Sequence, residues 1–267
     1  GANTVDGGAG ADTITGGTGA DNITGGDGAD RIVMAGNLTS ADTISGGNGA
    51  DVVQVSAAVT ASTVLANVDA ETLEVDGATA VTLAAATNIA TFDFSDTGNQ
   101  VLTLSAGYTG ATEVVLTGDA TTNQDKVVNT AGVALTVTAN VADVDAGTTI
   151  TGGAGTDTIN LANAATGTAD FTAVTLVETI NVITGGAAST ADPTIDLQSI
   201  ATAITVNGST LIAGEDLIVD GSSVTGAITA TGGAGADTLT GGAGNDVLTG
   251  GAGADQLLAR ADGNNTL

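Results

Sequence analysis

The sequence predicts an all-β protein: a right-handed parallel β-helix, or β-roll, solenoid. Three observations lead to this prediction. A nine-residue motif recurs near both ends of the chain and once in its middle. Large aromatic side chains, which supply much of the buried area of ordinary globular cores, are nearly absent, with three Phe, one Tyr and no Trp in 267 residues. Short segments alternate between apolar and polar residues, which is the pattern of β-strands.

The repeated motif has the form G-G-x-G-x-D-x-U-x, where U is an aliphatic residue. Its glycines permit positive φ angles and close approach of backbones, so they predict a tight turn. A single aliphatic residue at position 8, between polar neighbours, predicts a very short strand with one inward side chain. Eight copies match the motif, and they begin at Gly7, Gly16, Gly25, Gly46, Gly152, Gly232, Gly241 and Gly250.

The spacing of the copies predicts how they stack. Nine residues cannot enclose a core, but two copies form a flattened coil of eighteen residues with a turn at each edge. The acid at position 6 then lies above its counterpart two copies away. A three-residue insertion at 34–36 shifts both edges equally, as stacking requires. The expected columns are Asn3, Asp21 and Asp42; Asp12, Asp30 and Asp51; Asp237 and Asp255; and, after a one-residue slip, Asp246 and Asn265.

Stacked carboxylates repel one another unless a cation lies between them. The chain has 30 acids and three bases, for a net charge of −27. Ca²⁺ prefers six to eight oxygen ligands, which carboxylates and turn carbonyls can supply together. We therefore expect several calcium ions between the coils; the alternative is a metal-free solenoid in which these acids only form turns. The expected ligands are Asn3, Asp12, Asp21, Asp30, Asp42, Asp51, Asp157, Asp237, Asp246, Asp255 and Asn265, with the turn glycines Gly8, Gly10, Gly17, Gly19, Gly26, Gly28, Gly47, Gly49, Gly233, Gly235, Gly242, Gly244, Gly251 and Gly253.

Not every acid is expected to carry equal weight. Asp157 has Ala139 and Thr175 at the positions eighteen residues away, so it is expected to stand without a stacked partner. Asp216 lies 21 residues before Asp237 in a faint copy of the motif, which suggests a worn additional rung.

The distribution of copies predicts three regions. Residues 1–54 form a first repeat block, and residues 232–267 form a C-terminal block. Residues 55–231 are expected to continue as a degenerate β-helix with one isolated copy at 152–160, because strand-like segments recur about every ten residues. A separate β-sandwich is the alternative for this region. Helical turns or excursions are expected only at 60–70 and 194–203.

Composition also excludes several functions. The chain has no Cys and no His, so disulfides, zinc sites and the usual catalytic bases and thiols are excluded. With three bases it has no basic patch for nucleic acid, and no apolar run long enough for membrane insertion. Arg31 is expected to point outward and offset acidic charge, and Glu71 and Glu74 to lie on opposite faces at a solvated edge. The sequence therefore predicts that the chain is not an enzyme.

The eight copies resemble the nonapeptide repeats of the RTX family of secreted bacterial proteins. That resemblance implies calcium-induced folding outside the cell and export by a type I system. The family includes toxins, hydrolases with RTX tails, adhesins and surface-layer proteins, and the spacers at 67–75 and 176–182 look most like the last group. It implies a structural module of a secreted, self-assembling surface layer or extracellular fibre, with other copies of itself and cell-surface polysaccharide as partners.

Two other readings stay open at this point. The first is an RTX adhesin or an ice-binding stalk, for which Thr13, Thr15, Thr24 and Thr43 would form an outward row. The second is the non-catalytic RTX tail of a type I-secreted hydrolase or toxin.

Overall fold

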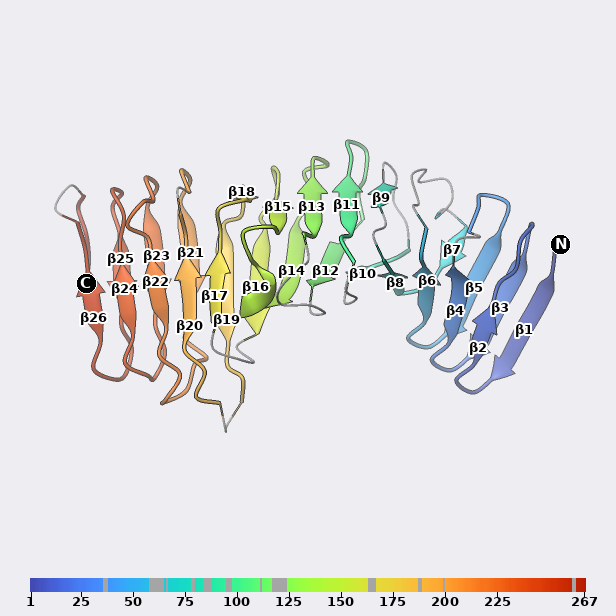
Figure 1. Cartoon of the computed structure of the whole chain (residues 1–267), viewed down its shortest axis with the longest axis horizontal. Coiled ribbons are helices and arrows are strands. Elements are labelled where there is room, and N and C mark those ends of the chain that lie inside the picture. The colour runs from blue at the N-terminus through green and yellow to red at the C-terminus, as the bar shows by residue number, and fades with distance from the viewer. Residues whose placement is uncertain are drawn as a thin grey trace. The chain divides into compact units, whose positions relative to one another are not determined.

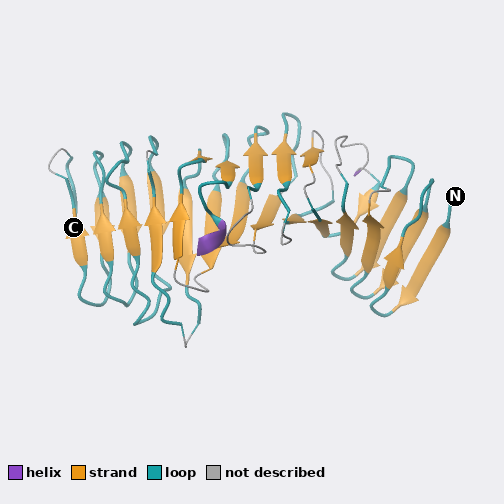
Figure 2. Cartoon of the chain, in the orientation of Figure 1, coloured by secondary structure: helices purple, strands orange, loops and turns teal. Residues whose placement is uncertain are grey.

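The computed structural model describes residues 1–35, 38–57, 65, 67–77, 80–83, 88–94, 98–110, 112–116, 124–162, 167–186, 189–198, 200–260 and 263–267. The chain divides into two compact units, Gly1–Asp119 with Gln124–Leu135, and Ala120–Asn123 with Thr136–Leu267. Strands and loops make up nearly all of the described chain (Figure 2). Within it, no helix has the length and apolar character needed to cross a lipid bilayer.

The first unit is a parallel β-solenoid, in which successive strands of one sheet come from successive coils (Figure 1). Its strands pair in the orders β1-β3-β5-β7, β2-β4-β6-β8-β10-β12 and β9-β11-β13. The strands are β1 (Thr4–Ala9), β2 (Thr13–Thr15), β3 (Asn22–Asp27), β4 (Arg31–Ala35), β5 (Thr43–Asn48), β6 (Val52–Val55), β7 (Val68–Asp69), β8 (Thr72–Val75), β9 (Ala80–Leu83), β10 (Thr91–Asp93), β11 (Val101–Leu104), β12 (Thr112–Leu116) and β13 (Lys126–Asn129).

The second unit is built on the same plan. Its strands pair in the orders β14-β16-β19-β21-β23-β25, β15-β18 and β17-β20-β22-β24-β26. A single 3₁₀ turn, η1 (Val141–Asp143), follows β14. The strands are β14 (Leu135–Asn140), β15 (Thr149–Thr151), β16 (Thr158–Ala162), β17 (Gly167–Asp170), β18 (Val174–Thr175), β19 (Thr179–Ile183), β20 (Pro193–Asp196), β21 (Ile204–Asn207), β22 (Ile218–Asp220), β23 (Ile228–Thr231), β24 (Thr238–Thr240), β25 (Val247–Thr249) and β26 (Gln256–Leu258).

The register of the first coils is the one that the repeat spacing predicts. Thr4 pairs with Asn22, an offset of 18 residues, and Asn22 pairs with Thr43, an offset of 21. Alternate copies therefore lie in opposite sheets, and the insertion lengthens one coil. The predicted parallel solenoid is confirmed, and the degenerate region continues it rather than forming a sandwich. Coil lengths there vary more widely, up to 26 residues. The division of the chain into repeat blocks and a degenerate region, at residues 54 and 231, stays a prediction.

The core consists of inward side chains stacked from coil to coil. Position 8 of the motif is buried in every copy except the last, where Leu257 is half-buried because only part of a coil follows it. Alternation along each strand separates this core from the outward residues. One such row in the first unit is Ile14, Ile32, Val53, Leu73, Phe92 and Val114, and one in the second is Val137, Ile159, Ile180, Val206, Ala230 and Leu248.

Three local predictions need correction. Strands β1, β3 and β5 extend through the first glycines of the motif, because the glycine backbones of adjacent coils continue the parallel pairing. Residues 194–196 lie in β20 rather than in a helical excursion. The expected excursion at 60–70 falls largely outside the described residues. The predicted stacking of Asp216 on Asp237, 21 residues later, is wrong by one residue. Ile218 pairs with Thr238, so Leu217 lies opposite Asp237.

Turn glycines set how closely the coils approach. A Cβ on Gly28 would clash with the carbonyl oxygen of Gly10 in the coil before, and a Cβ on Gly49 with that of Gly28. All three have positive φ, from 117° at Gly10 to 150° at Gly49. Gly10 has the same backbone conformation but nothing within 4 Å of its Cβ position. A comparison of substitutions at Gly10 and Gly28 therefore separates the cost of backbone strain from the cost of close packing.

We expect Gly28→Ala to destabilise the protein more than Gly10→Ala. Both substitutions place a Cβ at positive φ, which costs about 1–2 kcal/mol. Only Gly28→Ala also forces a methyl group against a neighbouring backbone, which adds roughly 1–3 kcal/mol. Chemical denaturation of the two variants in the same calcium buffer measures the difference. Equal free energies of unfolding would show that the close approach of the coils carries no energetic weight.

Candidate metal-binding columns

The structure brings the position-6 acids into the two predicted columns of the first unit. Each carboxylate points to the coil before it and accepts the backbone N–H of the residue at the same position there. Oδ1 of Asp21 accepts from Asn3 N at 2.8 Å, and Oδ1 of Asp42 accepts from Asp21 N at 2.8 Å. The second column is equivalent: Oδ1 of Asp30 and of Asp51 accept from Asp12 N and Asp30 N at 2.8 and 2.9 Å.

The columns at the C-terminus follow the same rule. Oδ1 of Asp255 accepts from Asp237 N at 3.0 Å, and Oδ1 of Asn265 accepts from Asp246 N at 2.8 Å across an offset of 19 residues. The predicted one-residue slip before Asn265 is therefore correct. Asp216 lies outside the column, since Leu217 N, rather than Asp216 N, donates to Oδ1 of Asp237. The side chain of Asp216 instead accepts from Ala236 N.

These carboxylates are buried, and several have an oxygen without a hydrogen bond. Asp30, Asp51 and Asp246 are at most 1% exposed. Oδ2 of each is buried and has no hydrogen-bond partner, and the same holds for Oδ2 of Asp12. A buried carboxylate oxygen without a donor is costly, and a cation is the usual way to satisfy it. The donor set therefore fits a hard, oxygen-preferring ion.

The rest of a coordination shell would come from the backbone. Within the described residues, no group of three or more acid side chains lies close enough to hold a metal ion on its own. The glycine turns offer rows of stacked carbonyls instead, for example those of Gly8 against Gly26 and of Gly10 against Gly28. Ca²⁺ accepts such carbonyls together with carboxylates. The glycine carbonyls and column carboxylates named from the sequence are thus gathered at the same turns, and their role as ligands stays a prediction.

Asp237 shows the electrostatic cost of a column without a cation. Burial raises the pKa of the Asp237 carboxyl, and the nearby charges of Asp255 and Asp216 raise it further. Hydrogen bonds from Leu217 N and Gly233 N oppose this rise without cancelling it. A divalent cation at this turn would oppose the rise, because it favours the charged form of the buried carboxylate and offsets the charges of Asp255 and Asp216.

Two glutamates outside the motif accept the N–H of a motif aspartate. Glu71 is exposed, as the sequence predicts, yet its side chain reaches Asp51, and Asp157 has a partner that the sequence did not predict. Oε2 of Glu71 accepts from Asp51 N at 2.8 Å, and Oε2 of Glu178 accepts from Asp157 N at 2.8 Å. The expectation that Asp157 stands alone is therefore wrong. An 18-residue spacing places Thr175 opposite Asp157, whereas this coil has 21 residues and places Glu178 there. The insertion at 34–36 also produces a coil of 21 residues, and this spacing was the signal that could have identified Glu178 as the partner of Asp157.

The remaining candidate residues have structural roles. Arg31 forms a bidentate ion pair with Glu74, at 2.6 Å from Nη1 to Oε2 and 2.5 Å from Nη2 to Oε1. The hydrogen bonds that Arg31 donates to Glu74 raise the pKa of Arg31, which stays charged. The threonine row of the ice-binding alternative is not formed. Thr13 and Thr15 pair with Arg31 and Val33 in one sheet, whereas Thr24 and Thr43 pair with Ser45 and Asn22 in another. An outward threonine row exists instead in the second unit, at Thr136, Thr158, Thr179, Thr205 and Thr229.

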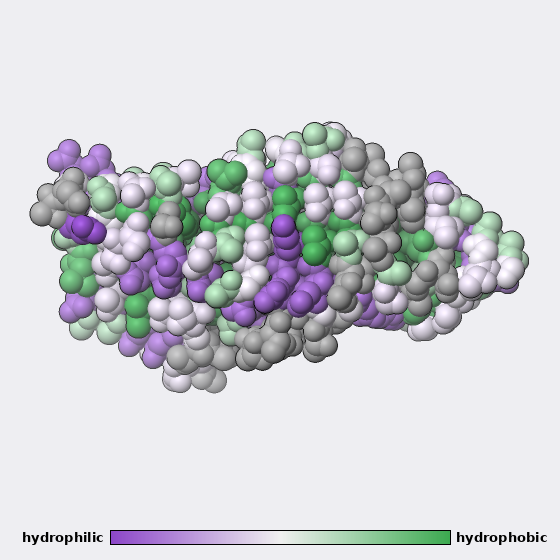
Figure 3. Space-filling view, turned by 45° about the horizontal axis from the view of Figure 1, so that its top comes forward, coloured by the Kyte–Doolittle hydropathy of each residue, from purple (hydrophilic) through white to green (hydrophobic). Residues whose placement is uncertain are grey.

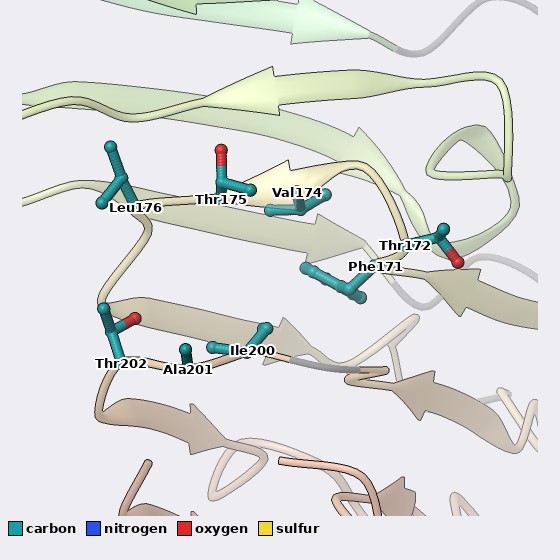
Figure 4. Close-up of a pocket in the computed structure, with 8 residues that line it drawn as sticks. All are labelled: Phe171, Thr172, Val174, Thr175, Leu176, Ile200, Ala201 and Thr202. Atoms are coloured by element: carbon teal, nitrogen blue, oxygen red, sulfur yellow. The ribbon is translucent and has the colours of Figure 1, made fainter. Parts of the chain in front are cut away.

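A surface groove in the second unit has no catalytic character. It has a volume of about 240 Å³ and lies between the loop around β18 and residues 200–202 (Figure 4). Its lining is apolar or hydroxyl-bearing and contains no acid and no base. The lining residues are Phe171, Thr172, Val174, Thr175, Leu176, Ile200, Ala201 and Thr202.

We expect Asp30→Asn to separate the hydrogen bond of the column from its charge. Asn265 shows that an amide oxygen can accept the column N–H, so the fold should persist. The loss of a charged ligand should weaken calcium binding, and each tenfold loss of affinity removes about 1.4 kcal/mol of stability at saturating calcium. In chelator the variant should retain at least as much β signal as the parent, because like-charge repulsion falls. Thermal unfolding in saturating calcium and circular dichroism in chelator test the two parts, and Asp27→Asn, an exposed acid, is the control. An unchanged stability in saturating calcium would contradict a role in calcium binding.

Comparison with known proteins agrees with this geometry. A family model for the RTX calcium-binding nonapeptide repeat matches four segments, at residues 1–32, 38–55, 149–163 and 231–267. These segments contain every column described above except its glutamate members. Searches of curated proteins and of solved structures found no significant match. RTX nonapeptide repeats bind several Ca²⁺ ions per array. The chain therefore carries RTX calcium-binding nonapeptide repeats in four segments, within an all-β parallel solenoid.

Proposed function

We propose that this chain is a structural, calcium-binding module of a secreted protein that assembles with copies of itself into a surface layer or an extracellular fibre. One observation carries the proposal: buried carboxylates recur at the turns of successive coils, with unsatisfied oxygens that a cation can bind. The proposed ligands are the Asp and Asn residues of the columns, with Asp21, Asp30 and Asp246 each lying between neighbours on both sides.

A structural role is favoured over catalysis. The fold of RTX repeats is a structural, non-catalytic one. Arg31, the base nearest the first columns, is fully engaged with Glu74. The groove beside β18 holds no titratable side chain. We therefore propose that the chain is not an enzyme.

A location outside the cell suits the chemistry. Extracellular modules bind calcium in the range of about 10⁻⁴–10⁻³ M, which only extracellular fluids supply steadily. A secreted protein without cysteine needs another cross-link between its coils, and bound calcium can serve as one. Type I secretion is the route that the RTX repeats themselves favour.

Self-assembly is supported by the character of the surface. The hydrophobic side chains visible in Figure 3 form separate patches between polar and neutral residues, so this face does not offer one large apolar interface. Acids, by contrast, are also arranged in register on an outer face: Asp170, Asp196 and Asp220 lie opposite one another on β17, β20 and β22. Each of these is held by a hydrogen bond from a residue two positions later. Divalent ions could join such faces, whereas monovalent salt only screens them.

Other acids outside the motif contribute less to this argument. Asp143 and Asp145 accept hydrogen bonds from their own turns, at Asn140 and at Gly147 and Thr148. Asp69 accepts from the side chain of Asn88. Asp96 and Asp119 lie outside the described residues. The in-register row at Asp170, Asp196 and Asp220 is therefore the better candidate for contacts between copies.

We expect chelation of calcium to unfold at least the repeat blocks at 1–54 and 232–267. Removing the cations leaves buried charges in every column, and the net charge of −27 then opposes compaction. Circular dichroism, with and without a calcium chelator, measures the loss of β signal. A β signal that persists after complete removal of calcium would contradict the coupling of calcium binding to folding.

We expect millimolar calcium to convert the protein into ordered sheets or fibres. Sodium chloride at equal ionic strength should not, because it does not bridge carboxylates. Light scattering and electron microscopy across a calcium titration provide the measurement. A protein that folds with calcium yet stays monomeric at high concentration would argue against self-assembly. That result would favour an adhesin or ice-binding stalk, or the RTX tail of an exported enzyme.

A further inference from the structure

Two five-residue segments outside the motif share the pattern E-T-[L/I]-x-V, at 71–75 and 178–182. The first lies in the coil after Asp51, and the second in the coil after Asp157. Val52 pairs with Thr72, and Thr158 pairs with Thr179. Since the acid directly precedes the strand in each coil, each glutamate takes the column position of the next Asp.

The two glutamates make the same bond in different units of the chain. Oε2 of Glu71 accepts from Asp51 N, and Oε2 of Glu178 accepts from Asp157 N, both at 2.8 Å. The donors belong to Asp51, which is 1% exposed, and Asp157, which is 0% exposed. Two occurrences of one pattern with one geometry indicate a built feature rather than a chance contact.

The polarity of the columns explains why this bond is needed. Every carboxylate in a column points to the coil before it, so the N–H of each Asp depends on an acceptor from the coil after it. The last Asp of a repeat block has no further motif copy to supply that acceptor. A buried N–H without an acceptor costs as much as a lost hydrogen bond. The column must therefore end on a residue that carries an acceptor but does not require the glycine turn.

Other column ends solve the same problem in other ways. The last rung of the second unit uses Asn265, whose amide oxygen accepts from Asp246 N. Asp42 N donates instead to the carbonyl of Thr39, at 3.2 Å within its own turn. An amide is therefore sufficient at a column end, so the charge of the glutamate is not what the position requires.

We propose that the glutamate of E-T-[L/I]-x-V is a cap that ends a calcium-binding column. It is a positioning residue: it holds the backbone of the last calcium-binding turn by accepting its N–H, and it passes the solenoid on to coils that lack the motif. The inference goes beyond the proposed function and stands on hydrogen-bond geometry alone, whether or not copies of the chain assemble. In a sequence, the pattern would then mark the coil that follows the last aspartate of a column.

Amide hydrogen exchange in the calcium-saturated full chain tests the cap. In Glu178→Ala the amide of Asp157 should exchange at least about tenfold faster, since it loses a charge-assisted bond. In Glu178→Gln it should stay within about threefold of the parent, because the amide oxygen still accepts. Glu71→Ala and Glu71→Gln should act in the same way on the amide of Asp51. Asp6→Ala, which removes an exposed acid from β1, is the control and should change neither amide.

Counting bound calcium by titration calorimetry separates a cap from a ligand. A cap predicts that both glutamine variants bind as many ions as the parent. The loss of an ion from either glutamine variant would show that the glutamate coordinates calcium and would overturn the proposal, as would unchanged exchange in both alanine variants. Should Glu178→Ala fail to fold, the Glu71 pair and the two glutamine variants still decide.

Discussion

A single interaction organises the turns of this protein: a carboxylate or amide oxygen at position 6 accepts the backbone N–H of the coil before it. The bond joins Asn3 to Asp21, Asp12 to Asp30 and Asp237 to Asp255 in the same way. It requires the side chain to be buried and to point along the solenoid, which places like charges in adjacent coils. Such an arrangement calls for a cation between the coils, which is the physical reason to expect that calcium binding and folding are coupled.

The glycines follow from that arrangement. Coils tied at their turns bring the backbones of those turns into contact, as between Gly28 and the carbonyl oxygen of Gly10. A side chain at Gly28 would separate the coils, break the column bond and disperse the carbonyls that a calcium ion needs. The glycines of the motif are therefore needed for the close approach that they permit as much as for their conformational freedom. The acid and the glycines of the motif depend on one another.

Some neighbouring coils are also held by neutral side chains. In the second unit, Asn181 donates to Asn160 at 2.9 Å and Asn207 donates to Asn181 at 3.4 Å, so amides form a row three residues after the column position. Such a row needs no cation and adds no charge. Buried Glu215 shows another solution: burial raises its pKa, but hydrogen bonds, led by those from Ile212 N–H and the Thr184 side chain, outweigh burial and lower it. The chain thus combines turns whose buried carboxylates call for a cation with turns whose polar groups are satisfied by hydrogen bonds.

The sequence by itself determined the parallel solenoid, the 18-residue coil and the columns of Asp21, Asp30 and Asp237, because a strict period fixes which residues meet in successive coils. It also determined the one-residue slip at Asn265. Only the tertiary structure decided the partners where the period is lost: the glutamates at Asp51 and Asp157, the displacement of Asp216 from its column, and the pairing of Arg31 with Glu74. Coil lengths in those regions vary, and a change of one residue moves a side chain to the other face of a strand. Which acid meets which N–H there depends on the path of each turn, and spacing alone does not encode it.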